Sequence, residues 1–182
     1  ATLRVTSGVG YTPDASQGSA SVNITDNDAI SEVWGTPGSE TVTGNNGTNI
    51  IGGVTKLPGT DNGRGVVDKL TGLLGNDTFV LADASRGTLY NDGKINSQGT
   101  SDYAQITDFN LSQGDKLQLR SGLQYLIQNV GINTYVYLGD GNFTFSASDE
   151  MIARLDGINL APGTQVYILA NIPNSQAWTS YV

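Results

Sequence analysis

The amino-acid sequence predicts an all-β protein, and three observations lead to this prediction. Glycine supplies 24 of the 182 residues, and Gly, Asn, Ser and Thr interrupt the chain too often for a long helix. Most apolar runs are short and rich in β-branched residues, which is typical of strands. Nonapeptide units with regularly spaced glycines occur in the first half of the chain, which indicates strands stacked as a repeat. A chain of this length can bury a core of its own.

Two alternating segments near the amino terminus, residues 2–6 and 19–25, predict strands. The second ends in an acidic D-N-D, and the whole stretch resembles the last two strands of a Calx-β domain. The resemblance implies that residues 1–30 are the remnant of a partial β-sandwich. Two strands are marginal alone, so we expect this chain to be the carboxy-terminal piece of something larger. Two acids here are candidate calcium ligands at a domain junction, with a solvated acidic linker as the equal alternative: Asp26 and Asp28.

After a short approach at residues 31–34, the clearest repeat unit is found at residues 72–80, which read G-L-L-G-N-D-T-F-V. Glycine stands at positions one and four, Asp77 at position six and Phe79 at position eight. Glycine lets the backbone turn sharply and direct carbonyl oxygens inward, and aspartate adds the anionic oxygen that Ca²⁺ prefers. The unit therefore predicts a calcium-binding turn followed by a strand whose phenylalanine points into the protein.

Three more units keep the same phase, at residues 35–43, 44–52 and 63–71, with an insert at 53–62. In a β-roll, successive nine-residue units lie on opposite faces of the coiled chain, so the first unit stacks on the third and the second unit on the fourth. A Gly/Asn-rich loop without metal is the alternative interpretation of this pattern. Position eight of the three units is apolar in each case, and these residues are expected to lie inside: Val42, Ile51 and Leu70.

The predicted stacking pairs the residues at position six. Glu40 and Asp68 are expected to face one ion, and Asn49 and Asp77 another. The other candidate ligands are turn residues whose carbonyl oxygens can face an ion: Gly35, Pro37, Gly44, Asn46, Gly63, Gly65, Gly72 and Leu74.

These units resemble the calcium-binding repeats of the RTX family of secreted proteins. Four later segments, D-T-F-V-L-A-D-A-S, S-D-Y-A-Q-I-T-D-F-N, G-D-K-L-Q-L and D-E-M-I-A, resemble a carboxy-terminal module of cyanobacterial surface proteins related to serralysin tails. Together the two resemblances cover roughly residues 35–182. They imply a short parallel β-roll (35–80) with a β-rich carboxy-terminal cap (81–182), both within one domain from residue 31. Three acids would help to close the last calcium site: Asp102, Asp108 and Asp115.

The sequence departs from the RTX pattern in the first two units, where Glu40 and Asn49 replace aspartate. We therefore expect Asp77→Ala to lower calcium affinity more than Asn49→Ala.

The predicted cap contains two strands at 123–138 around a turn, and further strands at 151–155 and 166–170. Residues 139–142 read G-D-G-N, which predicts a hairpin turn. This turn resembles a calcium loop only faintly, with Asp149 and Glu150 as distant acids. The aromatic tail at 178–182 is either a last strand or, by the RTX resemblance, part of the signal that a type I secretion channel recognises.

Composition excludes several classes of function. There are 9 basic and 17 acidic residues, a net charge of −8, which disfavours nucleic acid and anionic lipid as partners. The absence of Cys and His removes disulfides, thiolate sites and histidine-based catalysis. No apolar run approaches a membrane span, and residues 1–14 lack the apolar core of a signal peptide. No G-x-S-x-G motif is present, so we do not expect an enzyme.

The sequence therefore predicts a calcium-dependent structural and export module of a secreted or cell-surface protein. Its expected partners are calcium ions and the type I secretion machinery. The alternative is a self-assembling subunit of an extracellular fibre or surface layer, in which the amino-terminal strands insert into a neighbour.

Overall fold

The computed structural model describes residues 29–56, 61–94, 98–169 and 178–181. In this part of the chain the regular structure is made of strands without any helix, which confirms the predicted all-β class. The strands predicted at 2–6 and 19–25, and the candidate ligands Asp26 and Asp28, lie outside the described residues.

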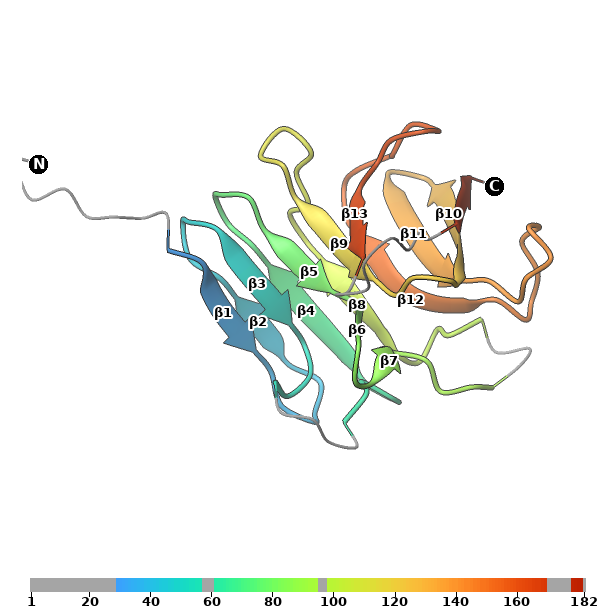
Figure 1. Cartoon of the computed structure of the whole chain (residues 1–182), viewed down its shortest axis with the longest axis horizontal. Coiled ribbons are helices and arrows are strands. Elements are labelled where there is room, and N and C mark those ends of the chain that lie inside the picture. The colour runs from blue at the N-terminus through green and yellow to red at the C-terminus, as the bar shows by residue number, and fades with distance from the viewer. Residues whose placement is uncertain (1–28, 57–60, 95–97, 170–177, 182) are drawn as a thin grey trace, which may run out of the picture.

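One sheet has five strands, and all of its pairings are parallel (Figure 1). Residues 31–34, which the sequence indicated only as an approach to the repeat, form the edge strand of this sheet. The order across the sheet is β1 (Ser31–Trp34), β3 (Asn49–Gly52), β5 (Thr78–Val80), β9 (Lys116–Leu119) and β13 (Tyr167–Leu169).

A second sheet has seven strands and mixed pairing. Its order is β14 (Trp178–Tyr181), β10 (Gln124–Val130), β11 (Asn133–Leu138), β12 (Glu150–Leu155), β8 (Tyr103–Ile106), β4 (Val67–Thr71) and β2 (Thr41–Thr43). Strands β10, β11 and β12 pair antiparallel, and every other pairing in the sheet is parallel. A small antiparallel ribbon, which the sequence did not predict, joins β6 (Ala82–Asp83) to β7 (Gly87–Thr88).

From β1 to β5 the chain alternates between the two large sheets, strand by strand. Val42 of the first unit pairs with Leu70 of the third, and Ile51 of the second pairs with Phe79 of the fourth. This is the stacking of alternate units that the repeat predicts. The calcium-loaded β-roll itself stays a prediction.

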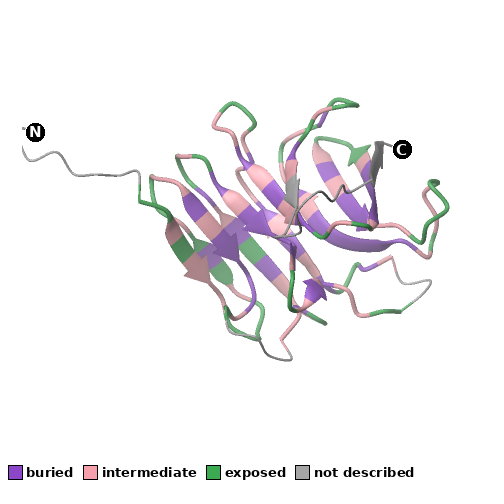
Figure 2. Cartoon of the chain, viewed as in Figure 1, coloured by how far each residue is buried: buried purple, intermediate pink, exposed green. Residues whose placement is uncertain are grey.

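The residues at position eight of the four units all lie in the main core, between the sheets. Each is at most 5% exposed, and residues from both sheets join the same buried cluster (Figure 2). Burial of each such side chain contributes about 1.5–3 kcal/mol to the stability of the fold. The period of nine thus places a continuous row of apolar side chains inside the molecule. Phe109, which follows β8, extends this row, with its ring centroid 6.1 Å from that of Phe79.

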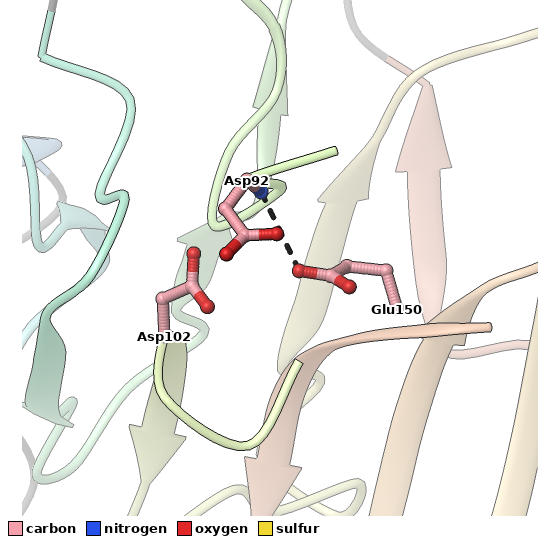
Figure 3. A group of neighbouring side chains, drawn as sticks. All are labelled: Asp92, Asp102 and Glu150. Carbon is pink, nitrogen blue, oxygen red and sulfur yellow. Dashed lines mark hydrogen bonds between the residues drawn. The ribbon is translucent and has the colours of Figure 1, made fainter. Parts of the chain in front are cut away.

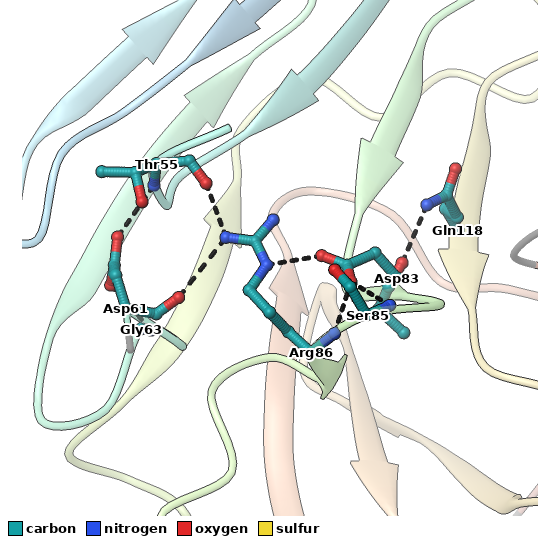
Figure 4. Close-up of polar contacts among 8 residues, drawn as sticks. Thr55, Asp61, Gly63, Asp83, Ser85, Arg86 and Gln118 are labelled. Atoms are coloured by element: carbon teal, nitrogen blue, oxygen red, sulfur yellow. Dashed lines mark hydrogen bonds and ion pairs between the residues drawn. The ribbon is translucent and has the colours of Figure 1, made fainter. Parts of the chain in front are cut away.

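The insert between the second and third units is held by one buried cation, Arg86 (Figure 4). Its Nε forms an ion pair with Asp83 at 2.6 Å, and its Nη1 donates to the carbonyl of Thr55 at 2.5 Å. Burial acts to raise the pKa of Asp83, but hydrogen bonds from Arg86 and Ser85 outweigh it and lower that pKa. The insert is therefore fastened to the β6–β7 ribbon from inside the protein.

The strands predicted in the cap are present, but the hairpin turn predicted at 139–142 is not. β10 and β11 pair antiparallel around Gly131, as expected. The segment G-D-G-N is not a tight hairpin turn, because the connection from β11 to β12 runs from 139 to 149. Side chains in this loop bond nearby backbone: Asp140 accepts from the N–H of Asn142 at 3.1 Å, which favours a series of local turns. The tail forms β14 and pairs in parallel with β10, as its last-strand interpretation predicts.

Candidate metal centre

Asn49, Asp77 and Asp115 form a buried row at the starts of β3, β5 and β9, which we call the Asp77 row. The N–H of Asn49 donates to Oδ1 of Asp77 at 2.9 Å, and the N–H of Asp77 donates to Oδ1 of Asp115 at 3.0 Å. Oδ2 of Asp115 accepts from the N–H of Asn110 at 2.9 Å. Each carboxylate thus satisfies backbone donors of a neighbouring coil.

One atom of this row has no such partner. Oδ2 of Asp77 is buried and accepts no hydrogen bond. It lies so close to Gly72 that a Cβ there would stand 2.3 Å away, so only glycine fits the first position of the turn. Burial raises the pKa of Asp77, and the charges of Asp115 and Asp108 add to the effect. An unpaired buried polar atom costs about 1–3 kcal/mol, and more when it is charged. A cation at Oδ2 would remove this cost.

The equivalent residue of the third unit, Asp68, is also fully buried but has both oxygens paired. Oδ1 accepts from the N–H of Glu40 at 3.2 Å, and Oδ2 accepts from the hydroxyl of Tyr90 at 2.8 Å. Burial raises the pKa of Asp68 to about 6. Glu40 turns back to its own turn, where its carboxylate accepts from the N–H of Thr36.

Asn49 uses its amide differently from a carboxylate. Its Oδ1 accepts from the N–H of Asn45 at 3.1 Å, and this contact identifies the other end of the amide as the nitrogen. Four oxygens surround Nδ2: the carbonyls of Asn45 at 2.9 Å, Gly47 at 2.5 Å and Gly72 at 3.4 Å, and Oδ1 of Asp77 at 2.6 Å. An amide donor therefore lies where several oxygens converge.

The structure separates the three acids that the sequence assigned to the last site. Asp115 belongs to the Asp77 row. Asp108 lies near it but caps the turn of the fourth unit, accepting from the N–H groups of Gly72 at 2.9 Å and Leu73 at 2.8 Å. Asp102 accepts from the N–H of Gly65 at 3.3 Å and lies in a different cluster.

That cluster consists of Asp92, Asp102 and Glu150, each with a carboxylate oxygen within 4.8 Å of the others (Figure 3). Asp102 and Glu150 are buried, and Glu150 accepts from the N–H of Asp92 at 3.4 Å. Lys94 neutralises part of the charge through its ion pair with Asp92. Burial raises the pKa of Glu150 to about 7, with the charges of Asp102 and Asp92 adding to it. Among the described acidic residues, this triad alone places three carboxylates so close together.

The sequence did not identify Asp92 as a candidate, and it grouped Glu150 with Asp149 and the turn at 139–142. Asp92, Asp102 and Glu150 come from distant parts of the chain and share no spacing, so no local pattern could have united them. Asp149, in contrast, points away from Glu150, as adjacent residues at a strand should, and accepts from the N–H of Asp140 at 3.0 Å.

The other predicted turn ligands fall into two groups. Gly35, Gly44, Gly63 and Gly72 are partly or fully buried, and a Cβ at any of them would lie within 3.0 Å of another atom. Pro37, Asn46, Gly65 and Leu74 are exposed turn residues.

No family model matches the chain, and comparison with curated proteins gives no significant match. In the part of the chain that the structure describes, no helix is long and apolar enough to cross a membrane.

Proposed function

We propose that this chain is a calcium-dependent structural module of a secreted or cell-surface protein, exported through a type I secretion system. The observation that carries the proposal is the Asp77 carboxylate. It is completely buried, its pKa is raised, and Oδ2 has no hydrogen-bond donor. A protein can hold such a group in the charged form only with a counter-charge nearby.

Calcium suits this position better than smaller or softer cations. The candidate donors are the Asp77 carboxylate and backbone carbonyl oxygens of its turn, which are hard ligands. Mg²⁺ demands a compact octahedron and gives up its water reluctantly, so it should bind such a turn poorly. Asp77 and carbonyls of its turn would hold the ion, and Asp115 and Asp108 would add negative charge nearby. The net charge of −8 favours cation binding in general.

Thermal unfolding of the full chain tests the proposal, because an ion that binds the folded state alone raises its melting temperature. Millimolar calcium should raise the midpoint by several degrees over excess chelator, and magnesium at the same concentration should not. Asp77→Asn is the matched variant, since it keeps the shape but removes the charge, and it should lose most of the response. Identical curves for the unmodified chain in calcium and in chelator would reject the proposal.

The fibre subunit is the second candidate, and the free edges of the two sheets favour it. In the described part of the chain, β1 and β2 each pair on one side only, so backbone groups at this end of the stack face outward. Such edges can accept another strand. Size-exclusion chromatography and negative-stain imaging, with and without calcium, should show filaments that disappear when residues 1–25 are deleted. A monomer at high concentration in calcium would contradict this candidate.

A further inference from the structure

Two hydrogen-bond donors occupy places in the repeat where the sequence pattern predicts an ion. We propose that the amide of Asn49 and the hydroxyl of Tyr90 take the place of cations at the second and third units, so that metal binding in the repeat is confined to the fourth. The proposal deepens the calcium function proposed above and rests on it. It identifies the two residues that determine which turns remain metal-free.

The surroundings of Asn49 Nδ2 support the first substitution. Four oxygens lie 2.5–3.4 Å from this nitrogen, two of them carbonyls of its own turn and one of them the Asp77 carboxylate. An amide NH₂ has two hydrogens, so four acceptors are more than it can serve fully. Convergent carbonyl and carboxylate oxygens are what a Ca²⁺ site requires. The partial positive charge of the amide serves the same oxygens without an ion.

The same position in the fourth unit holds a carboxylate, which cannot donate. In the turn of the fourth unit, Leu73 and Gly75 occupy the repeat positions that Asn45 and Gly47 occupy in the second unit. Oδ2 of Asp77 lies against Gly72 at the start of this turn and has no donor at all. The second and fourth units thus differ by one atom type at position six, nitrogen in one and oxygen in the other. That difference decides whether a cation is needed.

Tyr90 performs the substitution at the third unit. It is completely buried, its hydroxyl donates to Oδ2 of Asp68 at 2.8 Å, and its ring packs against Gly63. A Cβ at Gly53 would stand 2.2 Å from the hydroxyl oxygen, so the glycine makes room for it. The N–H of Tyr90 donates to the carbonyl of Asn62 at 2.7 Å, which fixes the residue between the insert and the third unit. Both oxygens of Asp68 are therefore already paired with a donor, unlike Oδ2 of Asp77.

Replacing each donor tests the inference by calcium stoichiometry. Asn49→Asp converts the central nitrogen into an oxygen and should add about one Ca²⁺ per chain in calorimetric titration. It should also widen the difference in melting temperature between calcium and chelator. Asn46→Asp is the control, because it adds the same charge to the same turn at an exposed position. An unchanged stoichiometry in Asn49→Asp, with the unmodified chain binding calcium, would overturn the inference.

Tyr90→Phe supplies the second test, and it keeps the inference falsifiable if a buried aspartate at 49 prevents folding. Without the hydroxyl, Oδ2 of Asp68 becomes free, so the variant should melt lower in chelator and recover in calcium. Tyr125→Phe is the control, since this buried hydroxyl bonds the backbone of Arg120 and lies outside the repeat. Its loss of stability should be equal in both solutions. Equal losses for Tyr90→Phe in both solutions would likewise overturn the inference.

These outcomes are separable from the failure of the proposed function. If the unmodified chain binds no calcium, the function proposed for Asp77 fails. A calcium response gained by Asn49→Asp or Tyr90→Phe would still show that the donors replace cations.

Discussion

Asp68 and Asp77 occupy the same position of the same repeat, yet their surroundings make different chemical demands. Both are fully buried at position six, where the turn leads into the strand, and each accepts a backbone N–H from the coil stacked upon it. Asp68 receives a second donor from Tyr90, whereas Oδ2 of Asp77 receives none. A repeat motif therefore specifies where a carboxylate lies, but residues outside the motif decide whether it needs a cation.

The largest effect should come from removing the fully paired carboxylate. Asp68→Ala leaves the hydroxyl of Tyr90 and the N–H of Glu40 without their acceptors. One buried and one half-buried donor left unpaired should together lower the free energy of unfolding by about 2–3 kcal/mol. Because no ion is involved, urea unfolding should give the same loss in calcium and in chelator. A loss restricted to calcium would mean that Asp68 is a metal ligand after all.

Asp77→Asn should have a smaller effect on stability and a different dependence on calcium. The amide can accept from Asn49 and also donate within its own turn, as Asn49 does in the second unit. In chelator the free energy of unfolding should therefore change by less than about 1 kcal/mol. In calcium the variant should fall below the unmodified chain by the whole binding contribution. Urea unfolding in both solutions measures the two differences, and an equal change in both would contradict this prediction.

Glu150 provides a buried acid outside the repeat, and its raised pKa predicts a pH dependence. Between its ordinary pKa of 4.5 and the folded value of about 7, the folded protein holds a proton that the unfolded chain has released. Stability in chelator should therefore fall as pH rises through this window, by about 1–2 kcal/mol. Glu150→Gln should flatten this part of the profile. A fall of the same size in the variant would assign the dependence to other groups.

The smallest effect is expected at Asp108, which lies beside the Asp77 row but caps a turn. Its two oxygens accept from the N–H groups of Gly72 and Leu73, and Leu73 has a positive φ of 72°. Asp108→Asn keeps one acceptor and should cost about 0.5–1 kcal/mol in chelator. It should lower calcium affinity less than Asp77→Asn does, as titration calorimetry can measure. A larger loss of affinity would make Asp108 a direct ligand.

The sequence by itself determined the class of the fold and the positions of the repeat strands. Glycine spacing and the apolar residue at position eight act locally, so a period of nine is sufficient to place Val42, Ile51, Leu70 and Phe79 in one core. The strands around Gly131 and the stacking of alternate units also follow from local pattern.

Only the tertiary structure decided which polar groups meet. Tyr90 reaches Asp68 from outside the repeat, and Asp92, Asp102 and Glu150 gather from segments with no common spacing. The long loop at 139–149 likewise replaced the expected tight turn. A hydrogen bond depends on angstrom-scale approach between groups that the chain brings together after its strands have paired. Such contacts leave no period in the sequence, and so they could not be predicted from it.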